Sequence, residues 1–434
     1  MPNRAPSFGR LECAQQFLPA KRFASQSIAR IVSLTYNWCM AVFKRVLQPS
    51  LIEAAHQLPV VLLTGPRQSG KTTLVRHCFS DKPYVNLEAV DDREYATEDP
   101  RGFLAQFPQG AILDEVQHAP ELLSYLQVLV DENPTSGQFI LTGSENLTLS
   151  QAAAQSLAGR VAIRYLMPLS YDELQQFPNA PNTLWETVWS GSYPRPFQSD
   201  ISPADWLQDY ISTYVERDVR RLAAIGDLST FQTFMRLVAG RTGQEINLSR
   251  LGNDTGVSHN TISHWLSLLE AGFLIWRLPP WFTNYNARWV KTPKLHFVDS
   301  GLVCALLSIR EPDQLAFHPL RGPIFETWAA AEIMKHRLHH NLPARNIYHL
   351  RQTRGLEVDI LIENGSTLTA VEVKSGQTLS SSFFKTLPAL ARQLDEKQTG
   401  HKPPDLRLVY GGDKSQVRRD IDVIPWNRLA DFSW

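Results

Sequence analysis

The stretch "VVLLTGPRQSGKTTLVRHCF" at residues 60–79 constrains the fold of this chain more than any other feature. The apolar run from Val60 to Leu63 predicts a buried strand, and "TLVRHCF" predicts the start of a helix. Between them lies the pattern G-x-x-x-x-G-K-[ST]. Further strands alternate with helical patterns downstream. This order indicates a parallel α/β sheet whose binding site lies at the carboxyl ends of the strands.

The loop between this strand and helix contains the residue types that binding a phosphate chain requires. Gly65 and Gly70 let the main chain come close to phosphates and turn its N–H groups toward them. The N-terminus of the following helix adds positive potential. Lys71 can reach the β- and γ-phosphates of a nucleotide, and the Thr72 hydroxyl can bind Mg²⁺. A glycine-rich turn that arose by chance is the alternative, and the flanking strand and helix disfavour it.

Two further apolar strands end in polar residues. In "GAILDEVQHAP" (110–120), Asp114 can hold Mg²⁺ through water and Glu115 can polarise an attacking water. An ordinary Asp-Glu turn is the alternative. Three polar residues near the end of the strand in "QFILTGSEN" (138–146) could sense the γ-phosphate or only form a turn: Thr142, Ser144 and Asn146.

Composition narrows the class of protein. The 434 residues are enough for two or three domains. Basic and acidic side chains number 43 each, so net charge gives no argument for a nucleic-acid partner. The four cysteines form no C-x-x-C pair, which argues against a disulfide framework or zinc knuckle and favours a reducing compartment, the cytoplasm. No apolar run reaches the roughly 18 residues that cross a bilayer, so we expect no membrane partner.

The first 39 residues contain no convincing periodic element. We expect residues 1–39 to be a disordered extension, with Met40 as the natural beginning of the protein. A signal peptide is the alternative, because the fairly apolar segment 31–43 follows several basic residues. Its basic region would be long, however, and no small-residue cleavage site follows.

The region after residue 200 is mostly helical. Residues 246–281 predict a helix, a turn at Gly256, a second helix and a strand from Phe273 to Leu278, which is a winged helix-turn-helix pattern. Ser258 is the expected N-cap of the second helix. The exposed face of that helix is polar but hardly basic, with Ser258, His259, Asn260, Ser263 and His264. DNA binding and a role as a lid or interaction module therefore both remain open.

Two apolar strands near the C-terminus carry charged residues. "LEVDILIENGSTLTAVEVKSG" (356–376) predicts two strands joined at Asn364 and Gly365, with Asp359 on the first and Glu372-x-Lys374 on the second. Such charges are costly on a buried strand unless they share a charge partner or a metal ion.

The pattern of these charges suggests a site for phosphodiester chemistry. Asp359 and Glu372 could hold a divalent cation beside a scissile phosphate, and Lys374 could orient or deprotonate the attacking water. Glu326, on the predicted helix "PIFETWAAAEIMKHRL", could complete the metal shell. Arg351 and Arg354 in "RQTRG" (351–355) are further possible phosphate contacts.

Several segments together resemble the AAA-type P-loop ATPases of a prokaryotic family in which a C-terminal domain of unknown function follows the ATPase core. They are "GPRQSGKTTL", "AILDEVQ", "LTGSEN", "LAGR" and "PLSYDEL", with "KTPKLHFVDSGL" (291–302) and "GPIFETWAAAEI" (322–333) further on. The resemblance implies ATP and Mg²⁺ as cofactors, roles in magnesium binding and hydrolysis for Asp114 and Glu115, and a sensor role near Ser144. The nucleotide contacts that it implies are Gly65, Pro66, Arg67, Gln68, Ser69, Gly70, Lys71, Thr72 and Thr73.

The same resemblance points to two arginines. Arg160 in "LAGR" and Arg217 in "YVERDVRR" match positions where such proteins keep an arginine. An arginine near the γ-phosphate, from the same chain or from a neighbouring subunit, would stabilise the charge of the transition state. A surface or helix-pairing role is the alternative for each.

The C-terminal charges are similar to those of the PD-(D/E)-x-K nuclease superfamily. Glu326, Asp359, Glu372 and Lys374 match its order of a helix with Glu, a strand with Asp and a strand with E-x-K. The resemblance implies a restriction-endonuclease-like domain. The alternative is a salt-bridged pair of strands in a nuclease-like fold without catalysis.

These observations predict an α/β chain with a parallel P-loop sheet, a helical winged-helix middle and a nuclease-like C-terminal domain. The expected ranges are an extension at 1–39, the ATPase domain at 40–200, the winged-helix region at 201–280 and the nuclease-like domain at 281–434. We expect an ATPase coupled to a nuclease-like domain that acts on DNA or RNA. The alternatives are a nucleotide-dependent switch or scaffold with a protein partner or as a homo-oligomer, and a winged-helix DNA-binding regulator.

Overall fold

The computed structural model describes residues 43–144, 153, 155–213, 227–281, 292–352, 355–396 and 402–434. The predicted extension at residues 1–39 lies outside this part of the chain. Asn146, Arg217 and Arg354, which the sequence singled out, also lie outside it.

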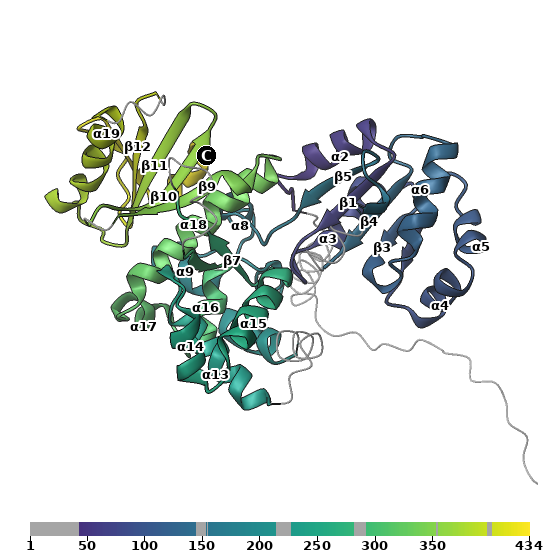
Figure 1. Ribbon diagram of the computed structural model, residues 1–434, viewed down its shortest axis with the longest axis horizontal. Coiled ribbons are helices and arrows are strands. Elements are labelled where there is room, and N and C mark those ends of the chain that lie inside the picture. The colour runs from purple at the N-terminus through teal and green to yellow at the C-terminus, as the bar shows by residue number, and fades with distance from the viewer. Residues whose placement is uncertain are drawn as a thin grey trace, which may run out of the picture. The chain divides into compact units, whose positions relative to one another are not determined.

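The first described region is built on a five-stranded parallel sheet with the strand order β2-β3-β4-β1-β5 (Figure 1). The prediction of a parallel α/β sheet is confirmed. The strands are β1 (Val60–Thr64), β2 (Tyr84–Asn86), β3 (Ile112–Asp114), β4 (Phe139–Gly143) and β5 (Val161–Tyr165). The helices of this region include α2 (Gln48–Gln57), α3 (Lys71–Cys78), α4 (Val90–Glu98), α5 (Pro100–Ala105) and α6 (Leu122–Glu132).

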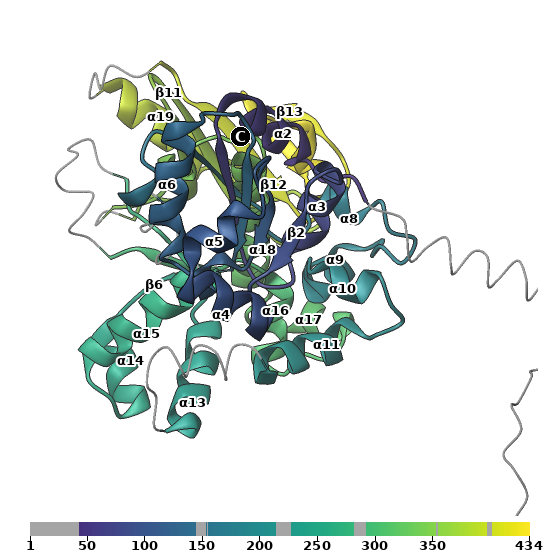
Figure 2. The ribbon, with the colours of Figure 1, turned by 90° about the vertical axis from the view of Figure 1, so that its right-hand side faces the viewer.

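Both faces of the parallel sheet are covered, which explains why its strands are apolar throughout. Val60 and Leu62 of β1 pack on the face covered by α6, whereas Val61 and Leu63 pack on the face covered by α2 and α3. Figure 2 shows α6 and α3 on opposite sides of the strands. The carboxyl ends of β1, β3 and β4 lie at one edge of the sheet, because the strands are parallel and paired in register.

The middle of the chain is mainly helical. Its helices are α8 (Tyr171–Leu174), α9 (Leu184–Ser190), α10 (Pro194–Phe197), α11 (Pro203–Tyr210), α13 (Leu228–Ala239), α14 (Leu248–Thr255), α15 (His259–Ala271), α16 (Ser300–Leu306) and α17 (Pro312–Phe317). Helix α14 ends at Gly256, which has a φ of 74°, and α15 begins after Ser258, whose hydroxyl accepts a hydrogen bond from the Thr261 N–H. The predicted helices, turn and N-cap are therefore confirmed.

A three-stranded antiparallel sheet follows the helix pair, with the order β6-β8-β7. Its strands are β6 (Gln244–Glu245), β7 (Ile275–Leu278) and β8 (Lys294–Phe297). Strand β7 lies within the predicted strand from Phe273 to Leu278. Strand β8 joins this sheet although it lies on the C-terminal side of the predicted domain boundary at residue 280.

The last region combines helix α18 (Arg321–His339) with a six-stranded mixed sheet of order β13-β14-β12-β11-β10-β9. Its strands are β9 (Ile347–Arg351), β10 (Glu357–Asn364), β11 (Thr367–Lys374), β12 (Asp405–Tyr410), β13 (Gln416–Arg418) and β14 (Ile421–Pro425). Strands β9, β10 and β11 are antiparallel; helix α19 (Thr386–Glu396) then leads to β12, which runs parallel to β11. The predicted strand pair is confirmed, with Gly365 in its turn at a φ of 62°.

Two glycines with positive φ angles provide a test of packing around the parallel sheet. Gly110 has a φ of 84°, and a Cβ there would lie 1.7 Å from the Gln138 carbonyl oxygen. Gly159 has a φ of 76°, and no described atom lies within 4 Å of a Cβ at that position. We expect Gly110→Ala to lower the free energy of unfolding by about 3 kcal/mol or more, and Gly159→Ala by about 1 kcal/mol. Equal losses in denaturant titrations of the two variants would contradict the packing around Gly110.

Candidate functional site

The loop between β1 and α3 has the backbone shape that its glycines predict. Gly65 has a φ of 149°, and a Cβ there would lie 2.1 Å from the Leu166 carbonyl oxygen. Gly70 has a φ of 95° and precedes the first residue of α3. Gln68 adopts a left-handed φ of 63° although it is not a glycine. The neighbouring main chain, as well as the expected ligand, therefore requires a small residue at position 65.

Lys71 is buried at the start of α3, inside the loop. Its ammonium donates hydrogen bonds of 3.0 Å to the carbonyl oxygens of Gly65 and Pro66. Burial lowers the pKa of Lys71, and the nearby carboxylates of Glu115 and Asp114 oppose this shift. A phosphate chain would give the ammonium anionic partners in place of neutral carbonyls.

The Ser69 hydroxyl lies in the same loop. It is buried and has no hydrogen-bond partner within the described part of the chain. An unsatisfied buried donor in a glycine-rich loop fits an anionic ligand, because burying a polar group without a partner is costly.

Asp114 is placed against Thr72, as the predicted magnesium site requires. The Thr72 hydroxyl donates to Asp114 Oδ2 at 2.9 Å, and the Tyr84 hydroxyl donates to the same oxygen at 2.7 Å. The Thr142 hydroxyl donates to Asp114 Oδ1. Asp114 lies at the end of β3, so the parallel sheet brings its carboxylate to the loop that follows β1. Tyr84 was not predicted, since nothing near it in the sequence marks a site.

Glu115 is the first residue after β3 and has a left-handed φ of 55°. Its N–H donates to the Thr142 hydroxyl at 3.1 Å, and its Oε2 accepts from the Ser144 hydroxyl at 3.1 Å. The Gln117 amide also donates to Oε2. Burial would raise the pKa of Glu115, but the Lys71 ammonium and the bonds from Gln117 and Ser144 more than offset this, so the pKa is lowered. The carboxylate is therefore ionised and fixed in place.

Arg160 does not reach this site within its own chain. It immediately precedes β5, and its carbonyl oxygen accepts from the Val60 N–H at the start of β1. The loop lies at the opposite end of β1, after Thr64. The guanidinium of Arg160 is bonded to Asp131 at 2.8 Å. A finger role in the same chain is thus wrong for Arg160, and a role toward a neighbouring subunit stays a prediction.

The remaining predicted contacts lie in or beside the loop. Arg67 pairs with Glu88 at 3.6 Å, and Thr73 is the third residue of α3. Arg45, which was not predicted, is buried behind the loop and donates to the Ser69 carbonyl oxygen at 2.7 Å. It lies 20 residues before Gly65 in the sequence and belongs to no recognisable motif.

The four predicted charges of the C-terminal region come together. In the pairing of β10 with β11, Ile360 lies opposite Val371, so that Asp359 and Glu372 are neighbours across the strands. Asp359 Oδ2 accepts from the Val373 N–H at 2.9 Å. The Lys374 ammonium lies 2.5 Å from Glu372 Oε1 and 3.8 Å from Asp359 Oδ2. Both carboxylates are buried.

A second lysine, Lys294 of β8, occupies the other side of this group. Its ammonium lies 3.0 Å from Glu326 Oε1, 3.1 Å from Glu357 Oε1 and 3.5 Å from Asp359 Oδ1. The predicted Glu326 is therefore joined to Asp359 through Lys294. We call the residues of this group the carboxylate cluster: Lys294, Glu326, Glu357, Asp359, Glu372 and Lys374. Lys294 is part of "KTPKLHFVDSGL", but only the fold reveals its partners, because they lie on α18 and β10.

If fully ionised, the carboxylate cluster would hold more negative charge than its two lysines balance. Burial, then the negative charge of Asp359, raises the pKa of Glu326 to about 8 and that of Glu372 to about 7. Glu372 Oε2 is buried without a hydrogen-bond partner among the described residues. A cation would fit this unmatched oxygen. The described side chains nevertheless include no set of three or more His, Cys, Asp or Glu residues arranged to hold a metal ion.

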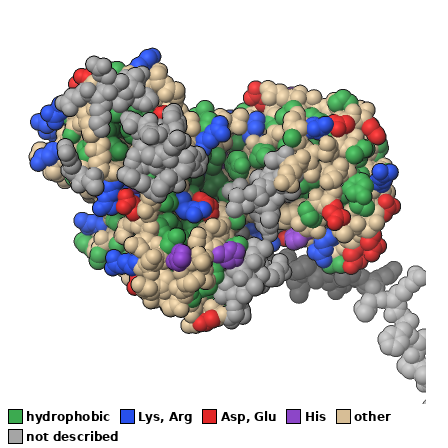
Figure 3. Space-filling model, in the orientation of Figure 1, with side chains coloured by type: hydrophobic (Ala, Val, Ile, Leu, Met, Phe, Trp, Pro, Cys, Tyr) green, Lys and Arg blue, Asp and Glu red, His purple; other side chains and the backbone are tan. Residues whose placement is uncertain are grey.

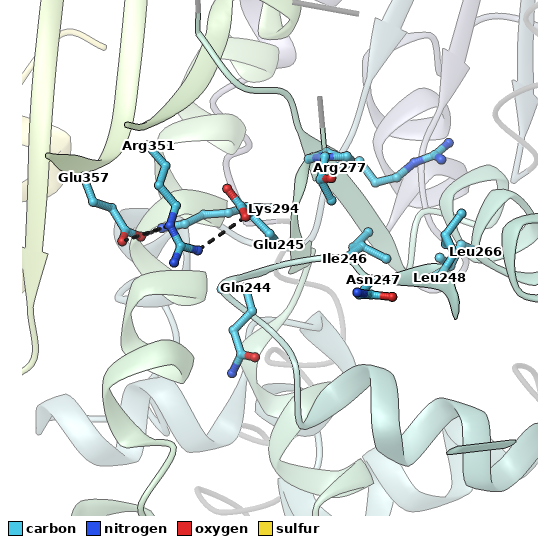
Figure 4. A pocket seen from close by; sticks show the side chains of 13 residues that line it. Gln244, Glu245, Ile246, Asn247, Leu248, Leu266, Arg277, Lys294, Arg351 and Glu357 are labelled. Atoms are coloured by element: carbon cyan, nitrogen blue, oxygen red, sulfur yellow. Dashed lines mark hydrogen bonds and ion pairs between the residues drawn. The ribbon is translucent and has the colours of Figure 1, made fainter. Parts of the chain in front are cut away.

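A cavity of about 750 Å³ opens beside the carboxylate cluster (Figure 4). Lys294 and Glu357 line it together with Arg351, whose guanidinium lies 3.3 Å from Glu245. The predicted phosphate contact Arg351 therefore lies at a cavity, but it is already paired. Acidic and basic side chains are interspersed on the face of the molecule shown in Figure 3.

Three domain families match successive parts of the chain. An AAA domain matches residues 57–175, a domain of unknown function (DUF8612) matches residues 181–313, and a second domain of unknown function (DUF4143) matches residues 321–429. The chain thus has an AAA-type P-loop ATPase domain, which implies ATP binding, typically with Mg²⁺, followed by regions of unknown function. The predicted resemblance to AAA-type ATPases is confirmed for this domain.

Relatives and solved structures add little about function. The uncharacterized protein Rv2008c of Mycobacterium tuberculosis is 29% identical over 380 residues, which cover 86% of this chain and 81% of that protein. An uncharacterized protein of Haemophilus influenzae is 24% identical over 207 residues, covering 44% of this chain and 50% of that protein.

The similar solved structures include a Walker-type ATPase and a nucleotide-bound protein. The Walker-type ATPase paby2304 of Pyrococcus abyssi is 17% identical, with 61% of this chain and 96% of that chain covered and a TM-score of 0.40. AMPPCP-bound DnaA from Aquifex aeolicus is 14% identical, with 52% and 86% covered and a TM-score of 0.27. Within the described part of this chain, no helix has the length and apolar character needed to span a membrane.

The raised pKa of Glu326 predicts how stability depends on pH. The unfolded chain loses this proton near the usual pKa of about 4.3, whereas the folded chain keeps it up to about pH 8, so stability falls as the pH rises between these values. Glu326→Gln should therefore raise the melting temperature relative to the unaltered chain at about pH 8.5, and much less at about pH 5. The exposed Glu53 provides the control variant Glu53→Gln. An equal effect of Glu326→Gln at both pH values would contradict the raised pKa.

Proposed function

We propose that the chain binds ATP with Mg²⁺ at the loop after β1 and hydrolyses it there. The observation that carries this proposal is the hydrogen bond of 2.9 Å between the Thr72 hydroxyl and Asp114, beside Lys71 and Glu115. These groups come from α3 and from the end of β3, which are 42 residues apart, and they meet at the edge where parallel α/β sheets bind ligands.

Each residue has a distinct task in this proposal. The backbone N–H groups of the loop and the Lys71 ammonium bind the phosphates, and Thr72 with Asp114 would hold Mg²⁺. Bound Mg²⁺ supplies positive charge at the phosphate oxygens. Glu115, ionised and held by Ser144 and Gln117, orients the attacking water and accepts its proton. Ser144 is thereby a positioning residue that would respond to the γ-phosphate through Glu115.

Substitutions at Lys71 and Glu115 test the two parts of this site separately. Lys71→Ala should abolish hydrolysis and weaken ATP binding, because it removes the cation that faces the phosphates. Glu115→Gln should bind ATP normally but hydrolyse it about 100-fold more slowly, since the amide cannot accept the proton. Phosphate release and the binding of a fluorescent ATP analogue measure the two effects.

The exposed Glu53 again gives a control, because Glu53→Gln should leave both measurements unchanged. Equal rates of ATP hydrolysis by the purified Lys71→Ala variant and the unaltered chain would contradict the ATPase proposal. Hydrolysis at the normal rate by Glu115→Gln would leave ATP binding standing and remove Glu115 from its proposed role.

A second proposal concerns the region from about residue 281 to the C-terminus. We propose that it is a restriction-endonuclease-like domain whose carboxylate cluster binds a divalent cation and acts on phosphodiesters of DNA or RNA. Helix α18, strand β10 and strand β11 supply Glu326, Asp359 and Glu372 in the order that this superfamily pattern requires. The unmatched Glu372 Oε2 supports this proposal, and the raised pKa values of two carboxyls show a local excess of negative charge that a cation could balance in place of protons.

The residues of the carboxylate cluster would divide the work. Asp359 and Glu372 would hold the cation, which would neutralise charge at the scissile phosphate. Lys374 lies against both carboxylates and can orient a water beside them. Lys294 would hold Glu326 and Asp359 in position, because its ammonium contacts both carboxylates.

The same geometry also supports the rival function. Lys294 can itself serve as the cation of the carboxylate cluster, and the region would then be an inactive module of a nucleotide-dependent switch or scaffold that contacts a protein. The exposed face of α15 has polar side chains, including His259 and His264, but no Lys or Arg among the residues singled out. DNA binding through α14 and α15 therefore stays a weaker prediction.

Asp359→Asn separates an active cluster from an inactive one. We expect this variant to lose Mn²⁺ binding in calorimetry and to lose cleavage of plasmid DNA or single-stranded RNA by about 100-fold or more, while remaining folded. Glu363→Gln is the matched control, because Glu363 is another buried carboxylate of β10 that lies outside the cluster. If the unaltered, folded chain neither binds millimolar Mn²⁺ at this cluster nor cleaves nucleic acid, the inactive reading is correct.

A further inference from the structure

Arg45 connects the loop between β1 and α3, which we call the phosphate loop, to the segment from Met167 to Glu173. The guanidinium is buried and donates from Nη1 to the Ser69 carbonyl oxygen and from Nη2 to the Met167 carbonyl oxygen, each at 2.7 Å. Its Nε lies 3.1 Å from the buried carboxylate of Glu173. One planar cation therefore fixes the loop, the segment after β5 and the helix α8 in a single geometry.

The segment from Met167 to Glu173 is bound on its other side by α18. The Met167 N–H donates to His339 Nε2 at 3.2 Å, and the Lys335 ammonium donates to the Leu169 carbonyl oxygen at 2.9 Å. Further contacts are the bond of 2.8 Å from the Tyr171 N–H to Glu332 Oε2 and the pair of Lys335 with Glu332 at 2.7 Å.

Helix α18 also carries Glu326 of the carboxylate cluster. Glu326 lies near its N-terminal end, and His339 is its last residue, so the two sites are separated by about 20 Å of continuous helix. A helix of this length moves as a rigid element. A shift of the segment from Met167 to Glu173, which α18 contacts, would therefore displace Glu326 relative to Asp359 of β10.

We propose that Arg45 positions the phosphate loop, and that Arg45 and α18 couple nucleotide binding to the geometry of the carboxylate cluster. The proposal rests on ATP binding at the loop, and it adds a route by which that binding regulates the C-terminal site.

The physical basis is the cost of separating buried charges from their partners. If a bound nucleotide changes the loop at Ser69, Arg45 must follow or leave a buried carbonyl oxygen without its donor. If Arg45 moves, Glu173 and the segment from Met167 must move with it, because an unpaired buried carboxylate is strongly unfavourable. Lys335 and Glu332 then transmit the shift to α18, because separating these buried groups from their partners is also costly.

Substitution of Arg45 tests the positioning role. Arg45→Lys keeps a cation beside Glu173 but cannot reach Ser69 and Met167 together, so we expect ADP affinity to fall about tenfold while the chain stays folded. Arg45→Gln should reduce affinity further and lower the melting temperature. The control is Arg164→Gln, because Arg164 donates to Ser50 of α2 at 2.9 Å and does not touch the loop. Unchanged ADP affinity in folded Arg45→Lys would overturn the positioning role.

Hydrogen exchange of the full chain tests the coupling. With ADP and Mg²⁺ bound, the amides of residues 321–339 should exchange about fivefold more slowly than in the free chain. Lys335→Met should still bind ADP but lose this protection, because it removes the bond to Leu169. Unchanged exchange of α18 in a chain that binds ADP would overturn the coupling, as would full protection in Lys335→Met. Absence of ADP binding to the unaltered chain would instead refute the ATP site on which the coupling rests.

Discussion

The buried guanidinium of Arg45 holds together the parts on which the nucleotide site depends. A cation inside a protein must be surrounded by acceptors, and Arg45 finds them in the loop at Ser69, in the main chain at Met167 and in the carboxylate of Glu173. Burial alone would raise the pKa of Glu173, but Arg45 and the nearby His339 lower it to about 2. The geometry of the loop therefore depends on the charge pair of Arg45 and Glu173 as well as on its glycines.

Burial imposes the same need for charge partners on the carboxylate cluster, but there the carboxyl groups outnumber the lysines. Lys294 and Lys374 face four carboxyl groups, so full ionisation would leave an excess of negative charge on a buried sheet. The structure meets this excess partly by holding protons, as the raised pKa values of Glu326 and Glu372 indicate. A divalent cation would be an alternative to those protons. The two sites thus differ in charge balance: the loop has a buried ammonium and a buried hydroxyl that suit an anion, whereas the cluster has more carboxyl groups than lysines.

The sequence predicted those features that local motifs encode. The strand, loop and helix around Lys71, the polar ends of β3 and β4, and the strand pair that carries Asp359 were all foreseen, because each is a short pattern with one backbone solution. Arg45 and Lys294 were missed, since their partners are distant in the sequence and no local pattern indicates them. Arg160 was misjudged for its own chain, because its motif does not reveal at which end of β5 the side chain lies.

A crystal structure with a non-hydrolysable ATP analogue and Mn²⁺ tests the central claim, that this chain combines a nucleotide site with a cation-binding carboxylate cluster. We predict two anomalous peaks, one beside Thr72 and Asp114 at the γ-phosphate and one between Asp359 and Glu372. Lys294 should remain in place on the far side of the second peak. A peak at the nucleotide alone, with Glu372 still unmatched at millimolar Mn²⁺, would contradict the account of the C-terminal region. Absence of both nucleotide and metal from the loop would contradict the account as a whole.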